Sequence, residues 1–415
     1  MKFIKNTLFN LEYYDETLPS GLKIRFIKKK GFIKKSVYLS VGFGSNYRKF
    51  KYMGKTYKIK EGIAHAIEHK IYENEDGSDA FKELSIMGVD ANAFTTTNFT
   101  CYHFKTTSDL LKPLLKTFDF ILHPYFNEQS LKREIPIILN ELSRKKEDPY
   151  YDYELKITST LYPNTSRRDS VLGSKSAIKS FTISDLYESY EAFYKLSNMR
   201  LVIVGDMDFS LILNEIKRYL APYKSTPYGE IIMDDYGYQS QNIRINNRNV
   251  IIPKSTLAFR VEDTSIKSYF IYLALFYYMY SSSGENRLKM VDSGLINTSL
   301  DATMYHEEGM LYGAISIEDR YAFKMINNIL ANLDSFNIYN MNEMDLKLFK
   351  RYYLGGIYSL SNNINELAET TVVKMVLDEE LFDTPNIINS ISLDDVYYAF
   401  LDFKKAKKII ISLYK

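Results

Sequence analysis

The sequence predicts an α+β fold of two tandem homologous domains, each a mostly antiparallel sheet packed with helices, that together enclose a cleft. Three observations support this. The chain has 415 residues, more than one compact core usually organises. Hydrophobic residues make up 46% and charged residues 25%, as in ordinary globular proteins. The two halves also repeat a similar order of short strands and helices.

The domain boundary is predicted where proline and glycine recur among polar residues and no long apolar period is found. This places a first domain at residues 1–221, a linker at 222–246 and a second domain at 247–415.

Each half has its own succession of elements. In the first half, the patterns predict strands over 37–41 and 91–105 and helices over 79–87, 110–122 and 127–144, besides a helical segment that carries His65. In the second half, they predict helices over 270–280, 287–292, 323–333 and 342–355 and a strand over 309–317. Residues Asn127, Glu128, Leu131 and Lys132 match Asn342, Glu343, Leu346 and Lys347 at one offset, 215. We interpret the shared order as a duplication.

Charge and targeting signals exclude several classes of protein. The formal net charge is +2, from 53 Lys+Arg against 51 Asp+Glu, whereas nucleic-acid binders usually carry a basic excess. Cys101 is the one cysteine, so no internal disulfide can form and a reducing compartment is compatible. The first residues lack a secretory signal pattern, and the most apolar run, near 270–280, is shorter than the ~20 residues of a membrane helix. We expect a cytoplasmic protein with no membrane span and no nucleic-acid partner.

One motif carries metal chemistry, His65-Ala66-Ile67-Glu68-His69. Residues four apart share a helix face, so His65 and His69 can offer ring nitrogens to one ion. Two histidines, a carboxylate and a water form a common catalytic zinc site. Glu68 is placed to accept a proton from that water. The order His-x-x-Glu-His is the signature of inverted zinc peptidases, and only five histidines are present, so chance is a poor explanation.

A third ligand is expected on the helix over 127–144. Glu134 and Glu141 are seven residues apart and share one face of that helix. Pro136 lies between them and can kink the helix. Spacing alone does not choose between the two carboxylates.

The motif and its surroundings resemble the insulinase/pitrilysin family of inverted zinc peptidases, with Glu141 following the motif after seventy-two residues. Gly62-Ile63-Ala64 is similar to the usual lead-in of that family. The resemblance covers nearly the whole chain, strongly over 35–206. It implies that His65, His69 and Glu141 bind one zinc ion, that Glu68 is the general base and that Glu134 supports the site.

The segment 88–96 resembles the family's substrate-binding edge strand, which assigns Asn92, Ala93, Phe94 and Thr95 to substrate binding. A peptide could join such a β-prone segment as an extra strand through backbone hydrogen bonds. Without the resemblance, an ordinary core strand is the better interpretation. His103, His123 and His306 are better explained as structural residues than as catalytic ones.

The second half lacks the chemistry of the first. At the offset of 215, Glu134 corresponds to Phe349 and Glu141 to Gly356, and no second His-x-x-Glu-His is found. The family resemblance implies an Arg and a Tyr, seven apart, that hold substrate and stabilise the reaction intermediate. In register with Gly294-Leu295, those positions hold Met290 and Asn297. Arg287 and Tyr305 are near but out of register.

The resemblance therefore implies a zinc metalloendopeptidase that acts on short or unfolded peptides, in maturation of leader- or bacteriocin-type precursors or in peptide clearance. The missing pair predicts a heterodimer in which a sister subunit of the same family supplies Arg and Tyr. The alternative is a non-catalytic interaction or scaffold subunit that retains a zinc motif. The intact Glu68 argues against it, because a structural zinc needs no base.

Overall fold

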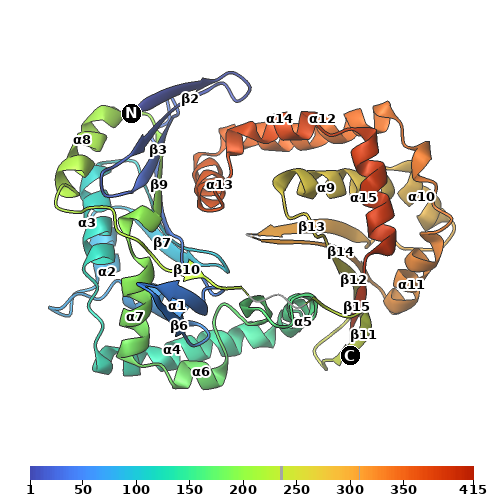
Figure 1. The fold of residues 1–415 in the computed structure, drawn as a ribbon, viewed down its shortest axis with the longest axis horizontal. Helices are drawn as coiled ribbons and strands as arrows, with labels where there is room; N and C mark the ends of the chain where they lie inside the picture. The colour runs from blue at the N-terminus through green and yellow to red at the C-terminus, as the bar shows by residue number, and fades with distance from the viewer. Residues whose placement is uncertain (234–236, 308) are drawn as a thin grey trace. The chain divides into compact units, whose positions relative to one another are not determined.

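The computed structural model describes residues 1–233, 237–307 and 309–415 (Figure 1). They form two compact units, each assembled from three stretches of the chain. Unit 1 comprises Met1–Arg144, Thr165–Asp234 and Tyr358–Phe382, and unit 2 comprises Lys145–Asn164, Asp235–Ile357 and Asp383–Lys415. The α+β class with two similar domains is confirmed.

Unit 1 contains, over the described residues, a seven-stranded sheet in the order β1-β2-β3-β9-β4-β8-β7. Its strands are β1 Lys2–Asn6, β2 Leu11–Thr17, β3 Lys23–Lys28, β4 Lys35–Val41, β7 Asp90–Thr95, β8 Thr100–Thr106 and β9 Met199–Gly205. Strands β3 and β9 pair in parallel and the other neighbours are antiparallel. The central strand β9 is buried throughout, because helices cover both faces of the sheet.

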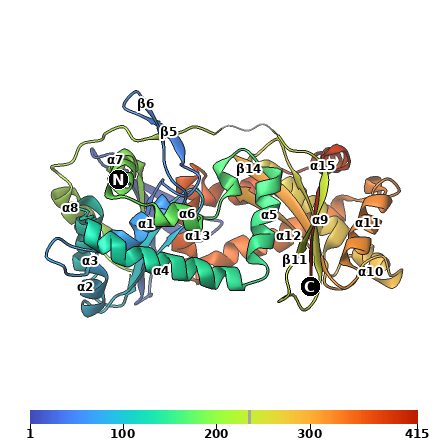
Figure 2. The ribbon, with the colours of Figure 1, turned by 90° about the horizontal axis from the view of Figure 1, so that it is seen from below.

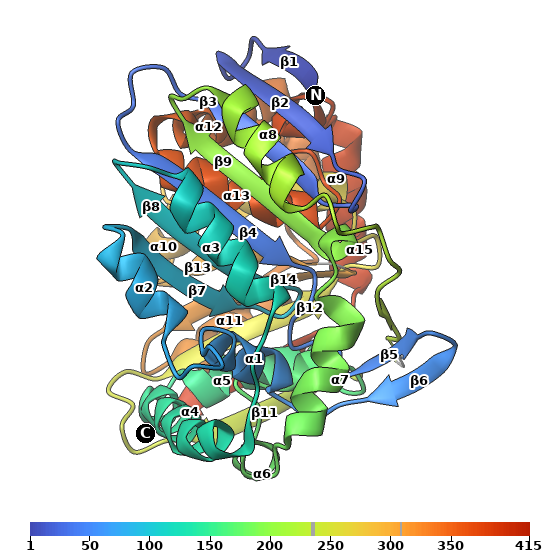
Figure 3. The ribbon, with the colours of Figure 1, turned by 90° about the vertical axis from the view of Figure 1, so that its left-hand side faces the viewer.

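The helices of this unit lie on two sides of the sheet. They are α1 Ile63–Lys70, α2 Ala80–Ile86, α3 Leu111–Leu122, α4 Glu128–Glu147, α6 Lys175–Lys179, α7 Ile183–Phe193, α8 Phe209–Tyr219 and α13 Ile364–Val376. Figure 3 shows α2, α3 and α8 in front of the sheet, with α13 behind it. A small sheet of β10 (Glu230–Ile231), β5 (Lys49–Tyr52) and β6 (Lys55–Lys58) lies beside α7.

Unit 2 contains, in the described part of the chain, a five-stranded sheet in the order β11-β15-β12-β14-β13. Its strands are β11 Gln241–Asn246, β12 Lys254–Arg260, β13 Asp301–Glu307, β14 Met310–Glu318 and β15 Ile409–Tyr414. Its helices are α5 Tyr151–Leu161, α9 Ile266–Tyr280, α10 Glu285–Asp292, α11 Ala322–Asn332, α12 Glu343–Ser359, α14 Thr384–Asn389 and α15 Leu393–Lys405. One apolar core lies between the sheet and α9, α11 and α15, and a second lies beneath α5.

The two sheets share one topology, as a duplication requires. The run β3-β9-β4-β8-β7 of unit 1 has the same order and the same single parallel pair as β11-β15-β12-β14-β13, over the described residues. Helices α4 and α12 begin 215 residues apart, which is the offset read from the sequence. The two halves also share a helix cap that was not predicted from the sequence. Thr182 and Asp185 form a capping box on α7, and Ser392 and Asp395 form one on α15.

Each unit takes one helix from the other half of the sequence. Helix α13 packs on β4 and β9 of unit 1, where the Tyr38 hydroxyl donates to Glu369 Oε2 at 3.2 Å. Helix α5 packs on β15 and β12 of unit 2, where the Tyr153 hydroxyl donates to Thr256 Oγ1 at 2.5 Å. The compact units are therefore not continuous halves of the sequence, and the boundaries at 221 and 247 stay predictions.

Several local details differ from the patterns in the sequence. The alternation over 91–105 forms two antiparallel strands, β7 and β8, because Thr96 starts a tight turn: Phe99 donates its N–H to Thr96 Oγ1 at 3.1 Å. The segment 222–246 contains β10 and β11. Among the helices that the structure describes, none combines the length and apolarity needed to span a bilayer.

Candidate metal centre

Helix α1 presents the motif from a tightly constrained start. Gly62 caps the helix with φ of 82°, a left-handed conformation that favours glycine. A Cβ on Gly62 would lie 2.3 Å from the Leu172 carbonyl oxygen, so the chain can approach this closely only without a side chain. Helix α1 then packs against β7, β8 and α7, and His65 is buried. The ring positions are therefore set by packing on three neighbours.

Helix α4 brings both candidate carboxylates to α1. It runs unbroken from Glu128 to Glu147 through Pro136, so Glu134 and Glu141 keep the common face that their spacing predicts. Glu141 Oε2 lies 3.4 Å from His65 Nε2 and 3.5 Å from His69 Nε2. Glu134 Oε1 lies 2.9 Å from the other ring nitrogen of His69, Nδ1. The two carboxylates thus have different positions, which sequence spacing could not decide.

The donor atoms of His65, His69 and Glu141 can hold one metal ion. They lie within 4.8 Å of one another. Ligands at the zinc–nitrogen and zinc–oxygen lengths of about 2.0–2.2 Å, in tetrahedral arrangement, lie about 3.4 Å apart. The two Nε2–Oε2 distances match that spacing. Two imidazoles and a carboxylate are also a ligand set that suits zinc.

Glu68 lies between this cluster and β7. Its Oε2 accepts a hydrogen bond from the Thr95 hydroxyl at 2.6 Å. Burial raises the pKa of Glu68. The hydrogen bond from Thr95 and the charge of His69 oppose this shift, whereas the charge of Glu141 adds to it. For His69, burial works against protonation, but the hydrogen bond with Glu134 and the nearby carboxylates outweigh it and raise the pKa. Glu68 and His69 of the motif therefore interact electrostatically with each other and with Glu141.

The segment assigned to substrate binding forms β7, which is the last strand of the unit 1 sheet over the described residues. Because side chains alternate along a strand, Ala93 and Thr95 face one side, and Thr95 shows that this is the side of Glu68. Asn92 and Phe94 face the other side, where the Phe94 ring lies 5.9 Å from that of His103. The contact between Thr95 and Glu68 was missed because 27 residues separate them in the sequence.

The comparisons with known proteins agree with this geometry. Residues 36–175 match the model of "Insulinase (Peptidase family M16)", and residues 180–392 match "Peptidase M16 inactive domain". The chain belongs to the M16 peptidase family. Together, these matches cover most of the chain, and the match described as inactive covers the half in which the sequence lacks a second motif.

M16 relatives resemble the chain at low identity. It is 27% identical to an uncharacterized zinc protease, YmfH, of Bacillus subtilis, over 92% of each chain. It is also 27% identical to the human mitochondrial-processing peptidase subunit beta, over 59% of this chain and 49% of that protein. A solved structure of a putative M16-like peptidase from Alicyclobacillus acidocaldarius shares the fold with a TM-score of 0.88, at 18% identity, covering 97% of this chain and 98% of the other.

The residues at and near the positions where the family resemblance implies Arg and Tyr make structural contacts in unit 2. Met290 packs against the apolar core. Asn297 donates to the Glu318 carbonyl and to Asp319, both at 3.1 Å. Arg287 donates to two backbone carbonyls, of Tyr280 at 3.0 Å and of Thr298 at 2.7 Å, so its guanidinium ties α10 to its neighbours. Tyr305 stacks on Tyr312 with ring centroids 4.7 Å apart.

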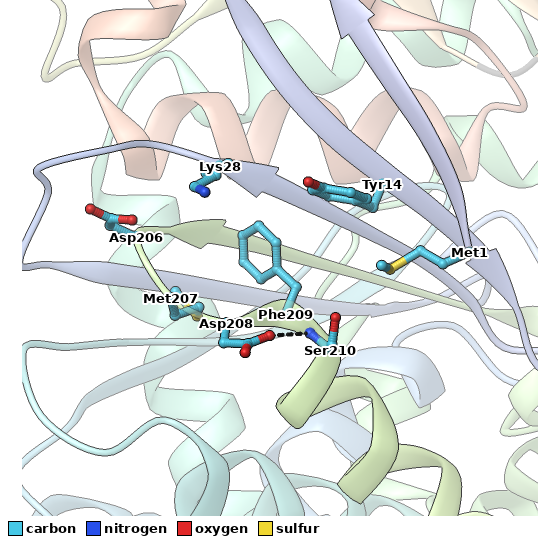
Figure 4. A pocket seen from close by; sticks show the side chains of 8 residues that line it. All are labelled: Met1, Tyr14, Lys28, Asp206, Met207, Asp208, Phe209 and Ser210. Carbon is cyan, nitrogen blue, oxygen red and sulfur yellow. Dashed lines mark hydrogen bonds between the residues drawn. The ribbon is translucent and has the colours of Figure 1, made fainter.

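A separate cavity of about 390 Å³ lies at the start of α8 in unit 1 (Figure 4). Its two aspartates have structural partners. Asp208 caps α8 by accepting from the Ser210 N–H at 2.9 Å, and Asp206 accepts from the Gly31 N–H at 2.7 Å. These contacts explain the acidic residues here as loop and helix caps.

Proposed function

We propose that this chain is a zinc-dependent endopeptidase, with His65, His69 and Glu141 as the metal ligands. The observation that carries the proposal is the convergence of their three donor atoms beside Glu68. Zinc held there would polarise the peptide carbonyl and make a water more acidic. Glu68 then accepts the proton of the attacking water and passes it to the departing amine. Glu134 orients His69 through Nδ1, which would leave Nε2 available to hold a zinc ion.

The outer edge of β7 is proposed to bind the peptide substrate. An extended peptide would add to this edge through backbone hydrogen bonds, which do not depend on its sequence. The side of β7 that carries Ala93 and Thr95 is the side of Glu68. The scissile bond would therefore be positioned by backbone pairing, and peptides without fixed structure would be preferred because folded chains offer no free strand.

We further propose that cleavage requires a sister subunit of the same family, and that the substrates are short or unfolded peptides in precursor maturation or clearance. Met290 and Asn297, at the positions for Arg and Tyr, support a partner that supplies both groups. A relative that is named as a subunit, the beta subunit of mitochondrial-processing peptidase, gives further support.

The test combines metal analysis with cleavage of an internally quenched peptide, using the chain alone and together with the candidate sister subunit. We expect about one zinc per chain and cleavage that appears with the partner. Glu68→Gln should keep the zinc and lower kcat about 10²–10⁴-fold. Glu128→Gln, which changes an exposed glutamate of α4, is the matched control and should retain full activity.

Two outcomes would change the proposal. Full activity of the chain alone would remove the need for a partner. Zinc binding without cleavage in any partner context would favour the scaffold subunit.

A further inference from the structure

The hairpin of β5 and β6 carries a concentrated positive charge, although the net charge of the whole chain is only +2. The thirteen residues from Arg48 to Lys60 include six lysines and arginines and no acidic residue. The strands are joined by Met53 and Gly54, both with positive φ, as a two-residue hairpin turn requires. Figures 2 and 3 show the hairpin extending beyond α7.

The two faces of the hairpin differ in chemistry. The register pairs Phe50 with Tyr57, and their rings stack at 5.2 Å. Phe50 also packs edge-on against Phe193 of α7 at 4.6 Å, which anchors this aromatic face on unit 1. The opposite face carries Lys49 directly across from Lys58. The anchored side is thus aromatic except for Lys55 beside the turn, and the other side carries Lys49, Lys51 and Lys58.

The cationic face places like charges side by side. Like charges directly opposite on neighbouring strands repel each other, and Lys51 follows Lys49 on the same face. Lysines commonly protect sheet edges from aggregation, which accounts for Lys58 on the outer strand β6. That explanation does not extend to β5, because β5 is paired on both sides, to β6 and to β10.

Acidic groups pair with the basic residues at the base of the hairpin. Arg48 pairs with Asp169 and with Glu61, and Lys60 pairs with Asp185 at 2.6 Å. Further out, Glu230 of β10 lies opposite Lys51 in the register. Lys51, Lys55 and Lys58 are nonetheless exposed to solvent, as is Met53 at the tip. An acidic ligand would meet three accessible lysines on one projecting element.

We propose that this hairpin docks an acidic, extended segment of the peptide substrate, a proposal that deepens the proposed peptidase function and rests on it. The outer edge of β6 offers backbone groups for strand addition, and Lys51, Lys55 and Lys58 neutralise carboxylates of the incoming segment. Residues 59–62 join β6 directly to α1, so the docked segment is attached to the part of the chain that carries His65. A membrane surface is a poorer occupant, because the turn offers one large apolar side chain, Met53.

The test measures binding of a fluorescent glutamate-rich peptide to the full chain by anisotropy, beside a glutamine-rich peptide of the same length. The triple variant K51Q/K55Q/K58Q should bind the glutamate peptide about tenfold more weakly and bind the glutamine peptide unchanged. The matched control is K112Q/K175Q/K179Q, which changes exposed lysines on other elements of unit 1. Equal melting temperatures of the three proteins check that each is folded.

The readouts separate this proposal from the peptidase itself. Binding needs no cleavage, so lysine-dependent binding together with no cleavage in any partner context overturns the peptidase and keeps the docking of an acidic segment. Unchanged binding in the triple variant, or equal weakening in the control, overturns the docking and leaves the zinc and Glu68→Gln results standing. Lysine-dependent sedimentation with phosphatidylglycerol vesicles, without peptide binding, also overturns it in favour of a membrane surface.

Discussion

At the residue scale, the two nitrogens of His69 have different neighbours. Glu134 lies at Nδ1 and Glu141 lies near Nε2. A carboxylate that accepts the Nδ1 proton fixes the tautomer in which Nε2 is free to bind a metal ion. Glu134 would therefore act through His69 rather than by contact with the ion.

Replacing Glu134 by Gln should lower zinc affinity about 10–100-fold, because the hydrogen bond that orients His69 is weakened. Competition with a chromogenic chelator measures this change. Glu128→Gln on the same helix serves as the control and should bind zinc as the wild type does. An unchanged affinity in Glu134→Gln would show that packing alone orients the ring.

His103 gives the protein a sensitivity to acid. Burial, and then the nearby Lys105, lower its pKa from 6.5 to about 4, while its ring stacks on Tyr38 at 4.7 Å. Above pH 6.5 the imidazole of His103 is mainly neutral in both the folded and the unfolded chain. As the pH falls from 6.5 towards 4, the unfolded chain binds a proton that the folded chain does not, so stability falls.

His103→Phe keeps an aromatic ring for the stack and removes this titration. Its free energy of unfolding should fall less than that of the wild type between pH 6.5 and 4, by about 1 kcal/mol after allowance for partial exposure. Urea denaturation at a series of pH values measures the difference. Parallel stability curves for the two proteins would contradict the assignment.

At the element scale, the start of α1 depends on two facing glycines. A Cβ on Gly62 would meet the Leu172 carbonyl, and a Cβ on Gly173 would lie 2.6 Å from the Glu61 carbonyl oxygen. Both residues have positive φ. This contact between loops fixes where α1 begins, and so where His65 and His69 point.

Gly62→Ala should destabilise the protein by about 3 kcal/mol or more, from left-handed backbone strain together with overlap against a backbone atom. Gly88→Ala is the control, because Gly88 has φ of 74° and open space around it. It should cost about 1–2 kcal/mol, from strain alone. Urea unfolding of both variants gives the difference, and equal losses would mean that the loop yields easily.

At the scale of the whole molecule, the exchanged helices make each half of the sequence incomplete. Helix α13 buries Leu367, Ala368 and Val372 in unit 1. Arg25, on β3, forms an ion pair with Asp15 at 2.7 Å and a second one with Glu380, also at 2.7 Å. Glu380 lies in the same segment of the chain as α13. The second half of the sequence thus covers one face of the sheet in unit 1, which carries the candidate metal ligands.

A fragment of residues 1–233 should therefore expose the face of β4 and β9 that α13 covers. We expect it to bind a hydrophobic dye and to aggregate, because a large apolar patch is left open. The same fragment with residues 358–382 appended through a flexible linker should bind less dye and aggregate less, although α5 still lacks its partners in unit 2. A monomeric, dye-negative fragment without the addition would show that the first half folds independently.

Short-range regularities in the sequence determined much of this protein. The spacing of His65 and His69, and that of Glu134 and Glu141, follow from helix geometry over one or two turns. The offset of 215 indicated the duplication that the matching sheets display. These features depend on neighbours along the chain, which is why they could be predicted.

Only the tertiary structure decided which groups meet across long separations. Helical spacing left the choice between Glu134 and Glu141 open and the family resemblance implied Glu141; the structure places Glu141 beside both Nε2 atoms, and it sets Thr95 against Glu68. It also placed α13 on the sheet of the other half, where Tyr38 and Glu369 are 331 residues apart. Such contacts depend on how whole elements pack, and a helical or strand period specifies a face without specifying its partner.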